Sequence, residues 1–126
     1  MLHRHHYTVE QANAALPAVG RTVRRVRDAR RLLLARGYDT GFTEDSERSG
    51  GAWPGREHAE AALEVALGFR VLEALDVVVR DLERGLIDFP SLRDGREVYL
   101  CWLLDEPEVG HWHSLETGFA GRRPLS

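Results

Sequence analysis

The chain has 126 residues, of which 43% are hydrophobic and 29% charged, and its formal charge is −3. These values predict one globular domain, and no apolar run approaches the roughly 20 residues that span a bilayer. All 17 basic residues are arginine, which excludes a Schiff-base lysine or a P-loop lysine, and the net charge predicts no general attraction to nucleic acid. The start of the chain lacks a signal-peptide pattern and its single cysteine cannot form an internal disulfide, so we expect a cytoplasmic protein with no membrane partner.

The first predicted element is a helix over residues 8–36. Thr8 and Gln11 have the spacing of a capping box at its start. Apolar residues then recur at helical spacing: Val9, Ala12, Leu16, Val19, Val23, Val26 and Leu33. Pro17 lacks a backbone donor, so we expect a kink there, or a short first segment that ends within residues 13–16.

Residues 37–56 are rich in Gly, Ser, Asp and Thr, which predicts a long, mobile connection. A second helix is expected over residues 57–75, with one buried face formed by Ala62, Val65, Ala66, Phe69 and Leu72. The end of the first helix is rich in arginine and the second helix in glutamate, so an antiparallel pair would match their charges. The basic face with Arg24, Arg27 and Arg31 is therefore interpreted as a solvated face, with phosphate binding as the alternative.

Residues 77–113 predict an antiparallel β-meander. The expected strands, separated by turn signals, cover residues 77–81, 86–90, 97–104 and 109–113. In the third strand, Cys101 shares one face with Tyr99 and Leu103, while the opposite face carries Val98, Leu100, Trp102 and Leu104. With an irregular tail over residues 114–126, the predicted fold class is α+β: a long antiparallel helical hairpin packed on a small three- or four-stranded antiparallel meander in one domain, residues 1–126.

Several phrases of the sequence occur together in one family: YTVEQANAALP, GLIDFP, DGREVYLCW, EPEV, WH and GFAGR. From Tyr7 to Pro124 the chain resembles a bacterial family known as domain of unknown function 2203. That family has no established reaction, substrate or cofactor, so the resemblance implies where a site lies and not what it does. The family pattern usually has an aromatic at position 111 and a glutamate at 114, where this chain has His111 and Ser114, which weakens any site that needs His111.

Four residues of the sheet region form a candidate metal site: His113, Glu106, Asp88 and Cys101. A zinc ion normally takes three or four such ligands, but their spacing here matches no established motif. The alternative is structural, with Cys101 as a small buried residue, His113 as a hydrogen-bonded core or rim residue, and Trp102 and Trp112 as packing. A third interpretation is a nucleophilic Cys101 activated by His113 or His111.

Two further groups of ionisable residues are considered, the carboxylate of Asp88 and the histidines near the start of the chain. Asp88 lies between the apolar residues Ile87 and Phe89, and Arg96 or Arg122 could pair with it. The histidines at positions 3, 5 and 6 precede the first helix, and we expect terminal disorder or adventitious metal binding there.

Two functions remain open. The first is a non-enzymatic binding or protein-interaction module with no cofactor, which forms a homodimer through the helices or binds another protein or a small molecule. Its candidate surface consists of Asp88, Arg96, Trp102, Glu106, His113 and Arg122. The second is a metal-dependent, hydrolytic enzyme with a divalent metal at His113, Glu106, Asp88 and Cys101.

Overall fold

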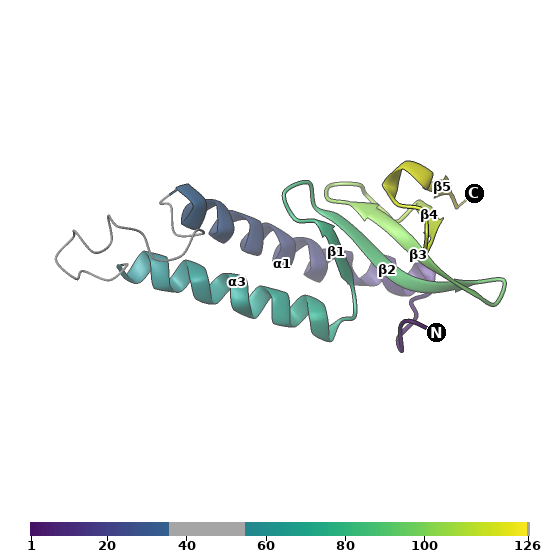
Figure 1. The fold of residues 1–126 in the computed structure, drawn as a ribbon, viewed down its shortest axis with the longest axis horizontal. Helices are drawn as coiled ribbons and strands as arrows, with labels where there is room; N and C mark the ends of the chain where they lie inside the picture. Colours follow the sequence, from purple (N-terminus) through teal and green to yellow (C-terminus); the bar gives the residue numbers. More distant parts are fainter. Residues whose placement is uncertain (36–54, 126) are drawn as a thin grey trace.

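The computed structural model describes residues 1–35 and 55–125. Two helices, α1 (Val9–Ala35) and α3 (Arg56–Ala74), lie side by side and run in opposite directions (Figure 1). One antiparallel sheet packs on them, and its five strands follow one another in chain order. The architecture is α+β, as the sequence predicts. Neither described helix is long and apolar enough to cross a membrane.

The sheet has five strands, where three or four were expected. The strands are β1 (Val78–Asp81), β2 (Leu86–Arg93), β3 (Arg96–Leu103), β4 (His111–Ser114) and β5 (Arg123–Pro124). The fifth lies in the tail that was expected to be irregular, after a short 3-10 helix, η2 (Phe119–Gly121), and it pairs with β4. A two-residue strand carries too little alternation to be recognised from sequence, because its pairing depends on where the chain returns to the sheet.

The start of α1 agrees with the predicted capping box. The Thr8 amide donates to the Gln11 side chain at 2.9 Å, and the Gln11 amide donates to the Thr8 hydroxyl at 3.1 Å. The predicted short first segment before Pro17 is wrong, because the helix continues through Pro17 to Ala35. Pro17 lies on the exposed side, where water can replace the backbone hydrogen bond that proline cannot make.

The buried face of α3 differs from the predicted one. Of the expected residues only Leu72 is fully buried, whereas Ala62, Ala66 and Phe69 are exposed. The contact with α1 runs instead past Gly68, where an added Cβ would lie 2.0 Å from a methyl group of Val26. The absence of a side chain at Gly68 thus allows the close approach of α1 at this point.

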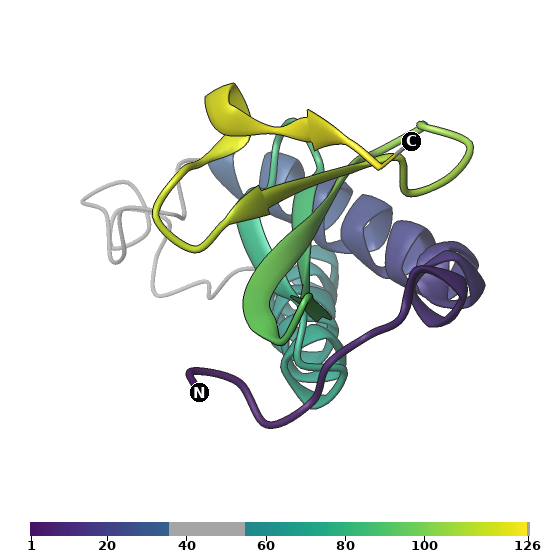
Figure 2. The ribbon, with the colours of Figure 1, turned by 90° about the vertical axis from the view of Figure 1, so that its right-hand side faces the viewer.

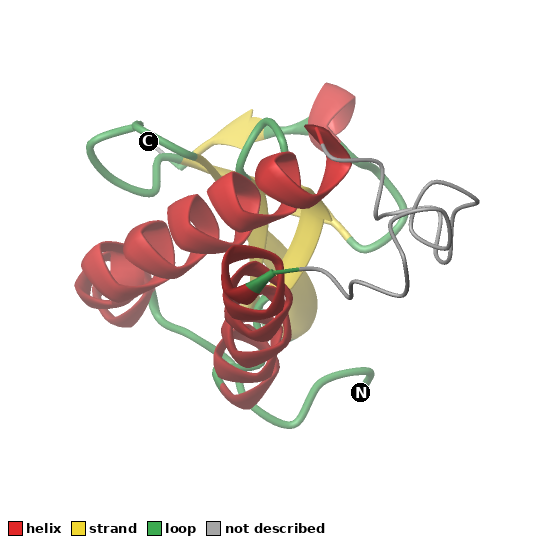
Figure 3. Ribbon diagram, turned by 90° about the vertical axis from the view of Figure 1, so that its left-hand side faces the viewer, coloured by secondary structure: helices red, strands yellow, loops and turns green. Residues whose placement is uncertain are grey.

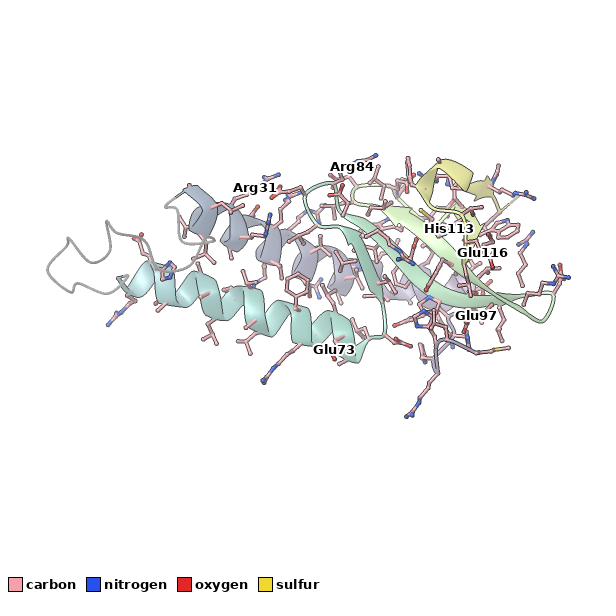
Figure 4. All side chains as sticks on the ribbon, in the orientation of Figure 1. Arg31, Glu73, Arg84, Glu97, His113 and Glu116 are labelled. Atoms are coloured by element: carbon pink, nitrogen blue, oxygen red, sulfur yellow. The ribbon has the colours of Figure 1, made fainter. Side chains whose placement is uncertain are left out.

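Most of the arginines on α1 have acidic partners within the fold. Arg25 donates to Glu64 of α3 at 3.0 Å, in line with the predicted charge match between the helices. Arg24 pairs with Asp105, and Arg31 donates at 2.9 Å to Glu83 in the β1–β2 turn. Figure 4 shows Arg31 beside the turn that also carries Arg84. These ion pairs support the interpretation of a solvated, internally neutralised face over phosphate binding.

The residues before α1 are tied to the sheet, so the expected disorder of the three histidines is wrong. The Tyr7 amide donates to the Pro90 carbonyl at 2.7 Å. The Glu97 carboxylate accepts from the amides of Leu2 and His3 at 2.8 and 3.0 Å and contacts the His6 ring at 2.7 Å. The predicted mobile connection over residues 37–56 lies outside the described residues apart from Gly55 and Arg56, at the start of α3.

Candidate metal centre

The two faces of the sheet have different roles. One face packs on the helices, and its core residues include Ile87, Phe89, Leu100 and Trp102. Figures 2 and 3 view the molecule from opposite sides, with the strands nearest in one and the helices nearest in the other. Because side chains alternate along a strand, Asp88 and Cys101 lie on the face opposite the helices. A polar cluster can therefore form there without interrupting the apolar core.

The strand register brings three potential ligands together on this face. A two-residue turn at Asp94 and Gly95, both with positive φ, joins β2 to β3 and pairs Asp88 directly with Cys101. His113 of β4 pairs with Tyr99, two residues from Cys101 on the same face. One oxygen of Asp88, the sulfur of Cys101 and one ring nitrogen of His113 all lie within 4.8 Å of one another, and all three residues are buried.

The orientation of the His113 ring suits metal ligation. Its Nδ1 lies 2.7 Å from the Ser114 carbonyl oxygen, which can only accept, so Nδ1 carries a proton. The other nitrogen, Nε2, lies 2.9 Å from Asp88 Oδ1. Metal-bound histidines usually donate their second N–H to a carbonyl or carboxylate in this way. Nε2 can therefore share a proton with Asp88 or bind an ion between the two groups.

Arg80 holds the second oxygen of Asp88. Its Nε donates to Asp88 Oδ2 at 2.8 Å, and its guanidinium lies 4.8 Å from the centre of the Tyr99 ring. The Asp88 side chain is 1% exposed and that of Arg80 is 42% exposed. This contact fixes the carboxylate plane and directs Oδ1 toward His113, as hydrogen-bond partners of metal ligands commonly do.

The environment of Cys101 disfavours a free thiolate. Burial, followed by the negative charge of Asp88, raises the pKa of the Cys101 thiol to about 12. At neutral pH the thiol is protonated, which argues against the nucleophilic interpretation. A divalent cation at the cluster would supply the positive charge that a thiolate needs, because metal coordination deprotonates cysteine.

The cluster forms one wall of a pocket with a volume of about 290 Å³. The opposite side of the pocket is the segment that follows β4, over residues 115–119. That segment is folded back by the Thr117 amide, which donates to the Ser114 hydroxyl at 3.3 Å. The three buried ligands thus lie at the wall of a pocket between the sheet and this segment.

A family model described as "Uncharacterized conserved protein (DUF2203)" matches residues 5–125. The chain belongs to this family. No curated protein and no solved structure matches the chain. The DUF2203 match covers the cluster and the segment that closes the pocket.

The other predicted site residues of this DUF2203 chain lie elsewhere. Glu106 does not join the cluster, because it receives two contacts from Arg122 Nη2 at 3.1 and 3.2 Å. Arg122 also donates to Nδ1 of His111 at 2.6 Å, which leaves the proton of a neutral His111 on Nε2. Trp102 belongs to the core on the helix side, where its indole N–H donates to the Glu106 carbonyl at 3.0 Å. The candidate surface therefore divides into the pair Asp88 and His113, a group with Glu106, Arg122 and Trp102, and Arg96 apart from both.

The predicted partners of Asp88 are also corrected. Arg96 lies just after the β2–β3 turn, and Arg122 is occupied by Glu106, so neither reaches Asp88. Its partners are His113 and Arg80, and sequence reasoning missed Arg80. The pairing of β1 with β2 shifts between Val79 and Asp81, so alternation could not place Arg80. The pairing of Asp88 with Cys101 had a signal, since a two-residue turn at Asp94 and Gly95 fixes that register.

Proposed function

We propose that the protein binds a divalent transition metal ion through Asp88, Cys101 and His113. The observation that carries the proposal is the convergence of three different ligand types within 4.8 Å of one another in a buried cluster. Thiolate and imidazole ligands favour zinc-type ions over magnesium and calcium, which prefer oxygen ligands. The proposed function is therefore that of a zinc-type metal-binding module.

The surroundings of the cluster support this proposal. Buried charged groups are costly unless they pair or ligate an ion, and Asp88 and His113 are both nearly inaccessible to solvent. The carbonyl of Ser114 orients the His113 ring, and the guanidinium of Arg80 orients the Asp88 carboxylate. A structural ion pair would need the same contacts between Asp88 and His113, so a direct measurement of metal content has to separate the two interpretations.

The experiment is elemental analysis and Zn²⁺ titration of untagged protein prepared without chelators. We expect one zinc per chain in the intact protein. His113→Ala should lose more affinity than the roughly 10–100-fold that is lost when only a hydrogen-bond partner of a metal ligand is removed. His111→Ala, which changes the neighbouring cluster, and a variant without residues 1–6 are matched controls that retain the metal. An intact protein that takes up no Zn²⁺ would refute the proposal.

A second candidate function is self-association through α3. A separate observation favours it, namely the exposure of apolar residues along this helix. Leu63, Leu67 and Val71 form a stripe along the helix and are 57, 49 and 46% exposed. An antiparallel pair of α3 helices centred on Leu67 would bring Leu67 against its own copy and Leu63 against Val71 of the partner. The partner we propose for this stripe is therefore a second copy of the chain, and sedimentation equilibrium tests it.

A further inference from the structure

The pocket beside the metal ligands has a mixed lining that points to a particular kind of ligand. Its polar wall consists of the three proposed metal ligands and Arg80, and its apolar walls come from Leu86, Leu115 and Phe119. The volume of about 290 Å³ is at the lower end of the range for ligand sites. A ligand that fits has few heavy atoms, with one polar end and one apolar end.

The three protein ligands leave one coordination position open. Zinc-type ions take four ligands in a tetrahedral arrangement, and sites with three protein ligands keep the fourth position for water or another small group. Asp88, Cys101 and His113 all come from the sheet and all line the pocket, so the fourth position lies on the pocket side. Figure 4 shows His113 near Glu116, which belongs to the segment across the pocket.

The charges of the loaded site favour an anion at that position. The Asp88 carboxylate and the Cys101 thiolate balance a dipositive ion, while His113 is a neutral ligand. The positive charge of Arg80, at the edge of the cluster, is then left over. Glu116 also lines the pocket and is exposed, as Arg80 is, but Arg80 is held at the cluster by its hydrogen bond to Asp88.

The apolar end of the ligand would lie against a preformed wall. Phe119 makes cation–π contacts with two guanidinium groups, those of Arg84 at 5.1 Å and Arg122 at 4.8 Å from the ring centre. Leu86 is buried in β2 and follows Gly85, whose positive φ fixes the turn before it. These side chains give the pocket an apolar surface that does not have to be created when a ligand binds.

On the condition that the proposed metal site exists, we propose that its open position binds the carboxylate of a small monoanion with a short apolar tail. The carboxylate completes the coordination of the ion beside Arg80, and the tail contacts Leu86, Leu115 and Phe119. The site would thus recognise short-chain organic acids in preference to inorganic anions such as phosphate.

The test is replacement of the metal with Co²⁺ followed by titration with acetate, butyrate and phosphate. The d–d spectrum reports the coordination of cobalt, and its thiolate charge-transfer band reports Cys101. We expect acetate to change the d–d bands while the charge-transfer band persists, and each added methylene up to butyrate to tighten binding by roughly fourfold. Phosphate should bind more weakly than butyrate.

Variants assign the two ends of the ligand. In protein saturated with Co²⁺, Arg80→Gln should weaken acetate binding by about fivefold or more, since hydrogen bonds to charged groups are the stronger kind. Arg96→Gln, which lies outside the pocket, is the matched control and should leave acetate binding unchanged. Leu115→Ser should remove the advantage of butyrate over acetate while acetate still binds.

The outcomes separate the two proposals. A protein that shows no cobalt spectrum refutes the metal site itself. A protein that binds Co²⁺ with a thiolate band, but whose d–d bands respond to none of the three anions, retains the metal site and overturns the carboxylate proposal. Equal binding of phosphate and butyrate overturns the proposed preference for an apolar tail.

Discussion

The helix pair and the sheet bury their side chains in contrasting ways. The helices approach each other closely where Gly68 packs against Val26, and they leave Leu63 and Leu67 of α3 exposed. The sheet buries large residues such as Phe89 on one face and a charged cluster around Asp88 on the other. The helical layer thus leaves apolar side chains exposed, while the sheet holds a buried ionisable cluster on the face opposite the helices. On this contrast rest the two proposals, a metal site in the sheet and a second copy of the chain against α3.

The largest effect on stability is expected at the buried charges of the sheet. In protein freed of metal by chelation, Asp88→Ala should lower the free energy of unfolding by about 3 kcal/mol, because it removes the buried partner of His113 and the acceptor for Arg80. Urea unfolding measures the change. Glu116→Ala, an exposed acid on the same side of the sheet, is the control and should stay within about 0.5 kcal/mol of wild type. A loss below about 1 kcal/mol for Asp88→Ala would mean that the cluster does not stabilise the fold.

Two glycines within helices provide the next test. Replacing glycine by alanine in a helix ordinarily stabilises it by up to about 1 kcal/mol. Gly68→Ala should instead destabilise the protein by about 1–3 kcal/mol, because the new methyl group would overlap Val26.

Gly20→Ala in α1 is the matched comparison. A Cβ added at Gly20 would have as its nearest neighbour the flexible end of the Arg24 side chain, at 3.3 Å. The substitution should therefore be neutral or stabilising. Thermal unfolding compares the two variants, and equal shifts of the same sign would contradict the close approach of the helices at Gly68.

The sheet and the helices also differ in how far their structure could be predicted from the sequence. Strand positions were predictable because alternation has a period of two and the turn at Asp94 and Gly95 has a strong signal. The buried face of α3 was not predictable from periodicity, since apolar residues occur on nearly every side of this helix between Ala61 and Val71. The small residue that decides the contact, Gly68, contributes little to any hydrophobic pattern.

The candidate site was predictable in part for a related reason. The residue types of Asp88, Cys101 and His113 identified them as potential ligands, and the β2–β3 turn fixes the pairing of the first two. His113 reaches them only through the pairing of β3 with β4, after a connection whose length does not determine the register. Glu106 was selected by residue type alone, and its place near the end of β3 directs it to Arg122 instead.

The next prediction concerns the contact between the sheet and the residues before α1. The hydrogen bond from His6, and then those from the His3 and Leu2 amides, lower the pKa of Glu97 to about 2 against the opposing effect of burial. The unfolded chain therefore binds a proton at higher pH than the folded chain does. The stabilisation from Glu97 is fully present above about pH 4.5 and is lost as the pH falls toward 2.

Melting temperatures measured against pH test this sign. Glu97→Gln should melt below wild type at pH 6, and the gap should close as the pH falls from 4.5 toward 2. For Glu116→Gln, an exposed acid without these contacts, any difference from wild type should stay the same across that range. A gap for Glu97→Gln that widened on acidification would contradict the proposed cause.

The smallest effect on the isolated chain is expected at the outer stripe of α3. Leu67→Ser removes an apolar group that is already 49% exposed, so the free energy of unfolding of dilute protein should change by no more than about 0.5 kcal/mol. If the stripe joins two copies of the chain, the melting temperature of wild type rises with protein concentration, because association stabilises the folded state by mass action. Leu67→Ser should abolish that rise, whereas Leu92→Ser, an exposed leucine on β2 away from the stripe, should retain it. A wild-type melting temperature that does not depend on protein concentration would contradict self-association through α3. The contrast between an associating helix pair and a ligand-binding sheet would then lose its first half.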